Sequence, residues 1–500
     1  LAPTLPVLIM GRALQGAFAA LISPTALSLL AVTFTEQRER IRAFAVYGAV
    51  ASSGAAAGLL LGGALTEYLD WRWYARYKKA IAFDVFGWLT HAGPFTPGEQ
   101  EEWDRLCDRH DEQAQTRREQ IIKASRDREL ENALNEQREP HLLYPALRIE
   151  EVRAHLVVLQ KLAAEISEQE PNAIVRRLYL EAIEEQVDYL IMVEATYQGD
   201  SQAFWEHNRR VHAEPTPEEM QATLGFLLGL LQRGMRQENT AEISASLLQD
   251  LQRTCDLNVF SHLQESEIQE RRDEPSAPVS GRGEDQRMIS PAVAKQFFEA
   301  VLREYGFSGW IIQLDHATNN FRIEANVQTL FLPAYKPLSL ARVRELLGHE
   351  LEFHVLRAEA GKASPLALLA EGTRNFLTID EGMAVYYDQQ TAQTQNRVLD
   401  GASVMTWIGT LATGLAAGVL SIPQTFLHLQ QMLERLYLLD RLLSKREGDL
   451  GKATAAAHRL ALNRCLRTYR GVPDLTVAGI CYAKDAIYLR GYLQLQRACL

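Results

Sequence analysis

The chain has 500 residues, of which 47% are hydrophobic and 23% charged, as in ordinary globular proteins, and this length predicts two or more folding units. A net charge of −11 without a dense Lys/Arg run argues against a nucleic-acid-binding protein, and we expect no nucleic-acid partner. The five cysteines are scattered and form no CxxC pair, which is typical of reduced thiols in an intracellular protein.

Residues 1–74 contain two long uncharged runs, over 13–34 and 43–65. Each is long enough to cross a bilayer core, which requires about 20 apolar residues. The short Arg-rich loop between them favours a cytoplasmic position for that loop. We predict two transmembrane-type helices, with two buried core helices as the alternative.

This first segment resembles the drug-export branch of the major facilitator superfamily. The stretch GRALQG, with Arg12 and Gly16, is similar to that family's fourth-helix motif. The Gly-rich run 48–73 resembles its fifth-helix motif, although the usual Gly-Pro pair is Ala57-Gly58 here. Because such a transporter needs roughly twelve helices, we interpret the segment as a transporter fragment without transport function of its own.

Composition divides the rest of the chain into four parts. We predict a charged helical linker over 75–140, the helical N-terminal part of a domain over 141–265, a linker over 266–286, and a zinc-binding catalytic part over 287–500. The uncharged run 402–427 is compatible with a third membrane span. Its Thr and Gly residues and its charged neighbours favour a buried core helix instead.

In the last part of the chain, over 287–500, the sequence predicts strands followed by one helix. WIIQL (310–314) and TLFLP (329–333) have strand composition, with HATNN (316–320) as the turn that follows the first. TLFLP is either an edge that accepts a peptide strand or an ordinary sheet member. The run 339–361 predicts a helix, with Ser339 as its N-cap and a glycine at its C-terminal end.

This helix carries His349, Glu350 and His354. Histidines four residues apart lie about 40° apart on a regular helix and can share a metal ion, whereas those five apart diverge by about 140°. Joint binding therefore requires a local distortion, such as one π-type turn or an unwinding near the helix end. The alternative is an amphipathic helix with two surface or half-buried histidines. His207 and His212 have the same spacing, and we interpret them as a solvated helix face.

Two acidic residues favour a metal site. Glu350 directly follows His349, which is the position of the general base in zinc proteases. Glu381 stands in an apolar context at the start of a predicted helix. Two histidines and one glutamate with an open position form the ligand pattern of catalytic zinc. We therefore predict Zn²⁺ bound by His349, His354 and Glu381, with Glu350 as general base.

Together these features resemble the microtubule-associated tyrosine carboxypeptidase family, in its bacterial QEGLA-motif branch, over residues 141–500. The similar stretches are YGFSGWIIQLD, RIEANVQTLFLP, GHELEFHVLRAEAG, IDEGMAVYYD and YRGVPDLTVAGICYAKDAIYLRGYL. The resemblance implies an HExxxH metallopeptidase with the same three zinc ligands. This chain has DEGMA where the family has QEGLA or EEGLA, so Asp380 and Met383 are departures.

The fold that the resemblance implies is α+β and mostly helical, with a zincin-like metallopeptidase domain, a small mixed sheet and two preceding transmembrane-type helices. The implied activity is a carboxypeptidase that hydrolyses the C-terminal bond of a peptide or protein with zinc-activated water. Arg357 or Lys484 would bind the substrate carboxylate, with a structural salt bridge as the alternative for each. Tyr488 would donate a hydrogen bond to the oxyanion.

Two other interpretations stay open. One is a multidrug-transporter-derived membrane protein whose soluble part is a non-catalytic binding domain. The other is a metal-free binding domain, against which the intact set of four site residues argues. We expect a cytoplasmic peptidase domain, and a membrane location and association if residues 1–74 are expressed. Because the chain starts at Leu1 and stops inside a helical pattern, we expect both ends to be truncated.

Overall fold

The computed structural model describes residue 33 and residues 71–109, 111–256, 287–307, 309–315, 321–324, 328–335, 337–394, 403–444 and 449–499. The chain divides into two compact units, Leu1–Trp71 with Ala363–Pro365 and Arg72–Lys362 with Leu366–Leu500. The elements below belong to the second unit, apart from Trp71. The two expected transmembrane-type helices lie outside the described residues except for Thr33, and so do the linker 266–286 and the turn 316–320.

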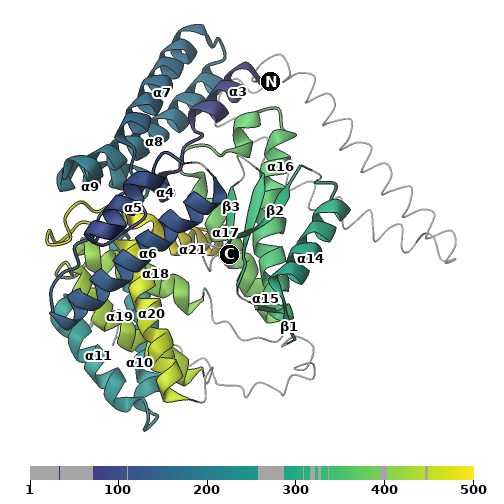
Figure 1. Ribbon diagram of the computed structural model, residues 1–500. Helices are drawn as coiled ribbons and strands as arrows, with labels where there is room; N and C mark the ends of the chain where they lie inside the picture. The colour runs from purple at the N-terminus through teal and green to yellow at the C-terminus, as the bar shows by residue number, and fades with distance from the viewer. Residues whose placement is uncertain are drawn as a thin grey trace. The chain divides into compact units, whose positions relative to one another are not determined.

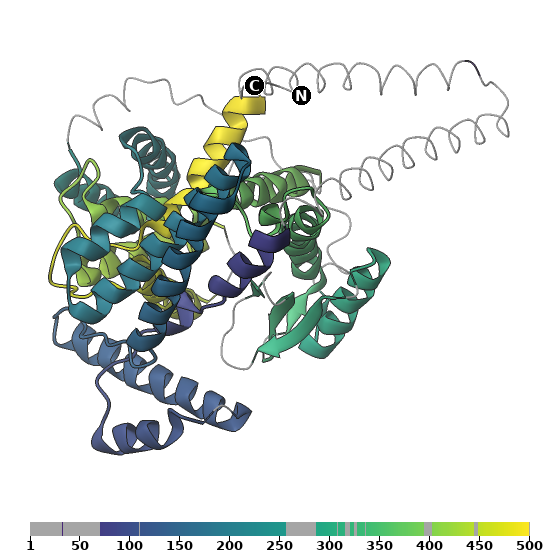
Figure 2. The same ribbon diagram turned by 90° about the horizontal axis from the view of Figure 1, so that it is seen from above.

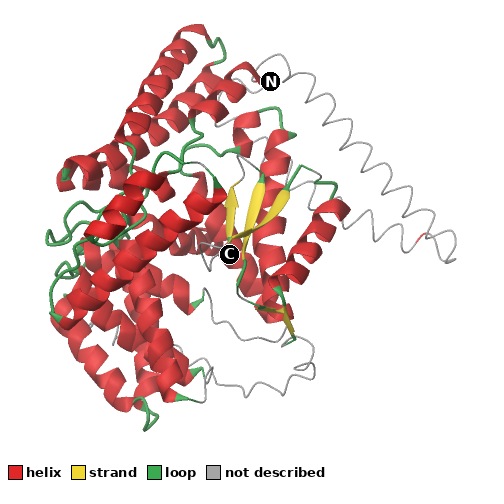
Figure 3. Cartoon of the chain, in the orientation of Figure 1, coloured by secondary structure: helices red, strands yellow, loops and turns green. Residues whose placement is uncertain are grey.

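Helices provide most elements of the second unit, as Figure 1 and Figure 3 show. In chain order the elements are α3 (Trp71–Ala80), α4 (Val85–Trp88), α5 (Pro97–Leu106), α6 (Glu112–Asn135), α7 (Ile149–Gln169), α8 (Ala173–Gln198), α9 (Ser201–Val211), α10 (Pro217–Met235), α11 (Ala241–Thr254), β1 (Met288–Ile289), α14 (Pro291–Glu304), β2 (Ile311–Asp315), β3 (Arg322–Glu324), β4 (Thr329–Pro333), β5 (Leu338–Ser339), α15 (Leu340–Leu346), η2 (Leu347–Val355), α16 (Leu356–Lys362), η3 (Ala367–Ala370), α17 (Phe376–Thr394), α18 (Val404–Ala417), α19 (Phe426–Leu443), α20 (Leu450–Thr468), η4 (Ala483–Asp485) and α21 (Ala486–Cys499).

Local sequence signals explain where these helices begin and which face they bury. α10 begins with a capping box, because the Thr216 hydroxyl accepts from the Glu219 amide while the Glu219 carboxylate accepts from the Thr216 amide. α7 buries one stripe of apolar residues at helical spacing: Val152, Leu156, Leu159, Leu162 and Ile166. The amphipathic pattern therefore directs one face of α7 into the core.

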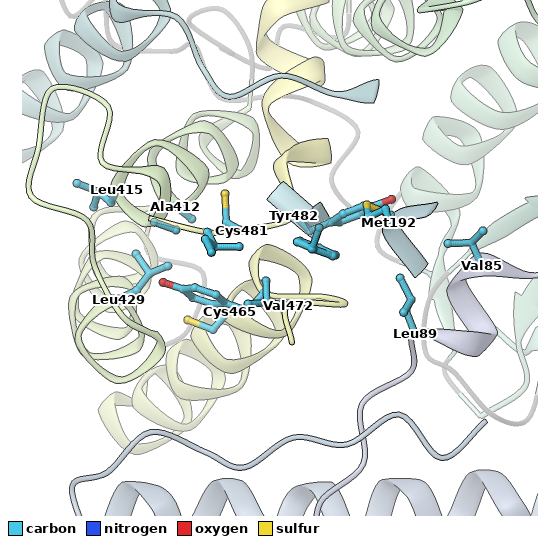
Figure 4. Close-up of a cluster of buried hydrophobic side chains, with 14 of the residues drawn as sticks. Val85, Leu89, Met192, Ala412, Leu415, Leu429, Cys465, Val472, Cys481 and Tyr482 are labelled. Atoms are coloured by element: carbon cyan, nitrogen blue, oxygen red, sulfur yellow. The ribbon is translucent and has the colours of Figure 1, made fainter. Parts of the chain in front are cut away.

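The largest hydrophobic core joins early and late parts of the second unit. Figure 4 shows Leu89 after α4, Met192 of α8, Leu429 of α19 and Tyr482 before η4 in one cluster. The segment 75–140, which was expected to be a charged helical linker, contains most of α3 and the helices α4, α5 and α6. Aromatic side chains of this segment are buried, among them Tyr77, Trp88 and Trp103.

The uncharged run 402–427 contains α18, which is buried from Trp407 through Ala416. The expectation of a core helix is confirmed, because α10, α19 and α21 pack around it. Among the described residues, none of the helices combines the length and the apolar character that crossing a membrane requires.

The strands form two small sheets. β2 and β4 pair in parallel, β3 pairs antiparallel with β4, and the order is β2-β4-β3. β1 and β5 form a separate antiparallel pair. α14 lies along the three-stranded sheet in both views (Figure 1 and Figure 2). Phe298 of α14, Leu330 of β4 and Val355 of η2 belong to one buried cluster, so this sheet supports the helix that carries the candidate site.

The expected fold class, an α+β zincin-like metallopeptidase domain, is wrong. The strand predictions at 310–314 and 329–333 are confirmed by β2 and β4. The strands of the described residues are only two to five residues long, however, and they make one two-stranded and one three-stranded sheet. Helices with apolar stripes form the larger core, so the architecture is mostly helical, as expected, but the described residues contain no zincin-like sheet.

Candidate metal centre

The candidate centre begins with a helix that changes its pitch. α15, η2 and α16 follow one another without a break from Leu340 to Lys362. Ser339 caps the start, because its hydroxyl accepts from the Arg342 amide, as predicted. The expected C-terminal glycine, Gly361, lies inside α16 instead. η2 is a π-helix over Leu347–Val355, which contains both candidate histidines.

The π-helix brings His349 and His354 together. A π-helix forms hydrogen bonds between residues five apart, so side chains at that spacing come onto one face. The two imidazole centroids are 5.3 Å apart, with 61° between the ring planes. The distortion that joint metal binding requires is therefore present at the expected place.

Glu381, in the first half of α17, completes the cluster. Its Oε2 lies 3.9 Å from Nε2 of His354, and one ligand atom from each of His349, His354 and Glu381 lies within 4.8 Å of the others. Two donors that share a zinc ion at about 2.1 Å each lie at most about 4 Å apart. The three groups are thus close to the separation that a shared ion requires, and all three are half-buried.

Two further carboxylates orient the imidazoles. Nδ1 of His354 lies 2.8 Å from Oδ2 of Asp380, and Nδ1 of His349 lies 3.1 Å from Oδ2 of Asp388. Each contact leaves Nε2 of the ring available for a metal ion, as in carboxylate–histidine–metal arrangements. Sequence reasoning missed this role for both residues. A usable signal was that Asp388 lies seven residues, or two helical turns, after Glu381.

The acidic surroundings shift the protonation of the centre. Burial disfavours charged His354, but the hydrogen bond with Asp380 and the nearby Glu381 outweigh it and raise the pKa of His354 to about 9. Burial likewise opposes a charged His349, while Asp388 and Glu350 raise its pKa. A metal ion must therefore displace a proton from His354 at neutral pH.

Glycines allow the helices that carry the ligands to approach closely. A Cβ at Gly382 of α17 would lie 2.4 Å from the backbone of Gly491 in α21. A Cβ at Gly348 would lie 2.5 Å from the ring of Tyr387. Side chains at these positions would separate η2, α17 and α21. The centre thus depends on close packing of α17 against the backbone of α21 on one side and of the Tyr387 ring against Gly348 on the other.

The other predicted site residues lie around this centre. Glu350 is half-buried in η2, and burial raises its pKa. Arg357 contacts Asp380, with its Nε 2.9 Å from Oδ1, and donates to the carbonyls of Leu369 and Ala370. These contacts favour the structural alternative for Arg357.

Lys484 and Tyr488 approach the centre from η4 and α21. Burial lowers the pKa of Lys484, and the negative charge of Glu381 opposes this shift. Burial and then Glu381 raise the pKa of Tyr488. Both residues are therefore within electrostatic reach of the third candidate ligand.

His207 and His212 have the same spacing in and directly after the regular α-helix α9, and their side chains do not come together. His207 lies in α9 and its Nδ1 is 2.7 Å from Oδ1 of Asp188. His212 caps the same helix and lies between the hydroxyls of Tyr189 and Tyr482, at 3.1 and 3.3 Å from its Nε2. The interpretation of this pair as a solvated face is wrong, because His212 is buried. The two rings nevertheless point to different partners.

Comparisons with known proteins find matches for the first segment. Residues 1–76 match the family model of the Major Facilitator Superfamily. The puromycin resistance protein pur8 of Streptomyces alboniger is 61% identical over 81 residues, 16% of this chain and 16% of that protein. The cephamycin export protein CmcT of Amycolatopsis lactamdurans is 49% identical over 65 residues, 13% of each chain. The multidrug resistance protein Stp of Mycobacterium tuberculosis is 42% identical over 72 residues, 14% of this chain and 13% of Stp.

These matches concern only the first segment of the chain. They confirm the resemblance of the first segment to a transporter of this superfamily, and the chain covers only 13–16% of the length of these three relatives. No solved structure matches the chain. The resemblance to the tyrosine carboxypeptidase family is not supported by the comparisons.

The assignment of a zinc carboxypeptidase is corrected accordingly. The relatives found are resistance and export proteins rather than hydrolases, so the expected enzyme, its hydrolase activity and the roles of Glu350 and Tyr488 in hydrolysis are not retained. The expected cytoplasmic peptidase domain has no support either. The interpretation as a transporter-derived protein with a non-catalytic domain agrees better with these relatives.

Proposed function

We propose that this chain is a membrane-anchored protein whose larger part is a non-catalytic metal-binding domain. The observation that carries this proposal is the convergence of His349, His354 and Glu381, whose ligand atoms lie within 4.8 Å of one another. Two imidazoles and one carboxylate are donors that zinc prefers. We therefore propose one Zn²⁺ ion per chain at this centre.

The surrounding residues fit an ion in this position. Asp380 and Asp388 hold the Nδ1 atoms of the two histidines, which leaves the Nε2 atoms for the metal. A bound divalent cation would also compensate the negative charge of Glu381 and the half-buried Glu350, which share the centre.

A metal ion here would connect two helical segments. The histidines belong to η2 and the glutamate to α17, and these elements are joined by a connection that includes Ala363–Pro365, assigned to the other compact unit. An ion that binds folded but not unfolded protein stabilises the fold by mass action. The role proposed for the ion is thus to fix η2 against α17.

Residues 1–74 are proposed to hold the chain at the membrane. Support comes from the two uncharged runs and from the family match over residues 1–76. The matched relatives are named for antibiotic resistance and export. Export by this chain itself is not proposed, because a transporter of this superfamily needs roughly twelve helices.

The test is the metal content of the full-length chain purified in detergent. After incubation with equimolar zinc and gel filtration, elemental analysis should give about one zinc ion per chain for wild type. Glu381→Gln and His354→Gln should lose most of this zinc. His207→Gln is the matched control, because it removes a histidine with the same spacing but different contacts, and it should retain the zinc.

Two results would overturn the metal proposal: wild type without zinc, or equal zinc content in the three variants and wild type. Membrane fractionation of cells that express the full chain tests the anchor separately. Recovery of the wild-type chain from the supernatant alone would contradict the anchor and leave the metal measurement unaffected.

A further inference from the structure

Four basic residues gather between the end of α20 and η4. Arg464 belongs to α20, Arg467 lies in its last turn, Arg470 follows the helix, and Lys484 lies in η4. Among the described residues, the acidic residue that forms ion pairs with this group is Asp485, which is buried. The cluster therefore carries more positive than negative charge within its own contacts.

Asp485 satisfies only two of these cations. One of its oxygens binds Arg464, and Oδ1 lies 2.5 Å from Nη2 of Arg467. Arg464 is further fixed by its contacts with the Tyr437 hydroxyl and the Met405 carbonyl. These two arginines hold the loop in place, and the direct ion pairs of Asp485 among the described residues go to them; its charge acts on Arg470 and Lys484 only at longer range.

Arg470 and Lys484 form no ion pair with any carboxylate in the part of the chain that the structure describes. Nε of Arg470 is buried and has no hydrogen-bond partner. Burial lowers the pKa of Arg470, which reflects the cost of keeping this charge out of water. A buried donor without an acceptor is expensive, and in a native fold it calls for an acceptor from outside the chain.

Both cations lie against the same aromatic ring. Cζ of Arg470 is 5.0 Å and Nζ of Lys484 is 4.8 Å from the centroid of Phe86, in α4. Phe86 is 40% exposed, while the two cations are half-buried, so solutes can reach this place from solvent. A phenyl ring stabilises a cation only partly and accepts no directed hydrogen bond from Arg470 Nε.

We propose that Arg470 and Lys484 bind the phosphate group of a small molecule, with Phe86 as the apolar wall of the site. Two unpaired positive charges match the charge of a phosphate, about −1.5 to −2 at neutral pH. The Arg470 guanidinium supplies directed donors, and the Lys484 ammonium supplies a point charge. This inference does not rest on the metal proposal, because none of its residues is a proposed metal ligand.

The experiment measures binding of inorganic phosphate to the full-length chain by isothermal titration calorimetry, with sodium chloride of equal ionic strength as control. Wild type should bind phosphate with a stoichiometry of one. Arg470→Met and Lys484→Met should each weaken this binding by about tenfold or more, since each removes a charge-assisted contact. Lys452→Met, which neutralises an exposed lysine of α20, is the matched control and should bind like wild type.

A second arm measures the midpoint of thermal unfolding. Without phosphate, Arg470→Met and Lys484→Met should unfold at or above the wild-type temperature, because each removes an unpaired charge. With phosphate, the midpoint of wild type and Lys452→Met should rise, while that of the other two variants should rise less. This arm also shows whether the variants are folded.

A third arm separates the sources of the phosphate group. Tighter binding of glycerol 2-phosphate than of inorganic phosphate indicates a phosphate ester, and weaker binding indicates free phosphate; both support the site. The proposal is overturned if wild type responds to phosphate no more than to chloride, or if the Lys452→Met variant loses as much affinity as the other two. Zinc content is not used in any arm, so failure here leaves the metal proposal standing.

Discussion

His349 and His354 lie five residues apart in the sequence, yet their imidazole centroids are only 5.3 Å apart. The π-helix η2 causes this approach, because its turn accommodates the additional residue. His207 and His212 have the same spacing but contact Asp188 and two tyrosines, respectively. The spacing alone therefore does not make a metal site; the helical pitch between the histidines does.

Asp380→Asn should weaken zinc binding by about 10- to 100-fold while the fold is kept. The Asp380 carboxylate lies 2.8 Å from Nδ1 of His354 and also contacts Arg357. The substitution replaces this carboxylate by a neutral amide, so both contacts lose the negative charge. Competition with a chromophoric zinc chelator measures the affinity. Asp108→Asn serves as control, because Asp108 is exposed and lies far from Asp380 in the sequence. Equal affinities of Asp380→Asn and wild type would show that this carboxylate does not orient the ligand.

The metal-free protein should lose stability as the pH rises from about 6.5 to about 9. The pKa of His354 is raised from 6.5 to about 9, so its protonated form stabilises the fold fully below 6.5, and this contribution disappears as the pH passes 9. The loss is at most about 3.4 kcal/mol, because one pKa unit corresponds to about 1.36 kcal/mol. Urea unfolding in the presence of a chelator, at several pH values, measures it.

The affinity for zinc should have the opposite pH dependence to the stability of the metal-free protein. Binding displaces the proton from His354, so zinc affinity should increase with pH over the same range. A His354→Gln variant should lose the part of the stability trend that His354 contributes, and it should bind zinc only weakly at any pH in this range. Metal-free stability that rises with pH between 6.5 and 9 in wild type would contradict the assignment of a protonated His354.

Gly382→Ala should destabilise the fold by about 1–3 kcal/mol, as overpacked interiors usually do. The new Cβ would lie 2.4 Å from the backbone of Gly491, which cannot move aside as a flexible side chain could. Gly229→Ala in α10 is the matched control, since its Cβ would meet nothing within 4 Å, and it should stabilise by about 0.5–1 kcal/mol. Urea unfolding compares the two. If Gly382→Ala left the free energy of unfolding unchanged, α17 and α21 would be packed less closely than the structure shows.

Leu60→Arg should reduce the recovery of the full chain in the membrane fraction. Leu60 lies in the uncharged run 43–65, and an arginine within a membrane helix is unfavourable, by up to about 2.5–3.5 kcal/mol at the helix centre on insertion scales. Val157→Arg, in an exposed position of α7, is the control and should leave the distribution unchanged. The anchor would be in doubt if both variants fractionated like wild type.

Sequence patterns predicted several local features correctly and failed for features that depend on assembly. The cap at Ser339, the strands β2 and β4 and the buried helix α18 follow from short-range signals. The need for a local distortion between His349 and His354 followed from the angle between successive residues of a regular helix, and the structure shows that this distortion is a π-helix. The zincin-like fold was wrong, because short strand signals do not state how many strands join or which helices cover them.

The remaining errors also concern partners that lie far apart in sequence. The sequence pattern placed His212 on the surface, but the residue is buried, and its Nε2 contacts the hydroxyl of Tyr482, which lies 270 residues away in the sequence. The position of Asp388 two helical turns after Glu381 was a usable signal, but its partner His349 became evident only once η2 was placed against α17. The unpaired Arg470 could not be predicted, because its isolation depends on where Asp485 and Phe86 lie in space.

X-ray absorption spectroscopy of the zinc-loaded full-length chain tests the central claim most directly. Two imidazole nitrogens and carboxylate oxygen at about 2.0–2.2 Å should surround the ion, and Glu381→Gln should change the oxygen shell. A spectrum of hydrated zinc, or a first shell that is the same in wild type and in the variant without His354, would contradict binding at His349, His354 and Glu381.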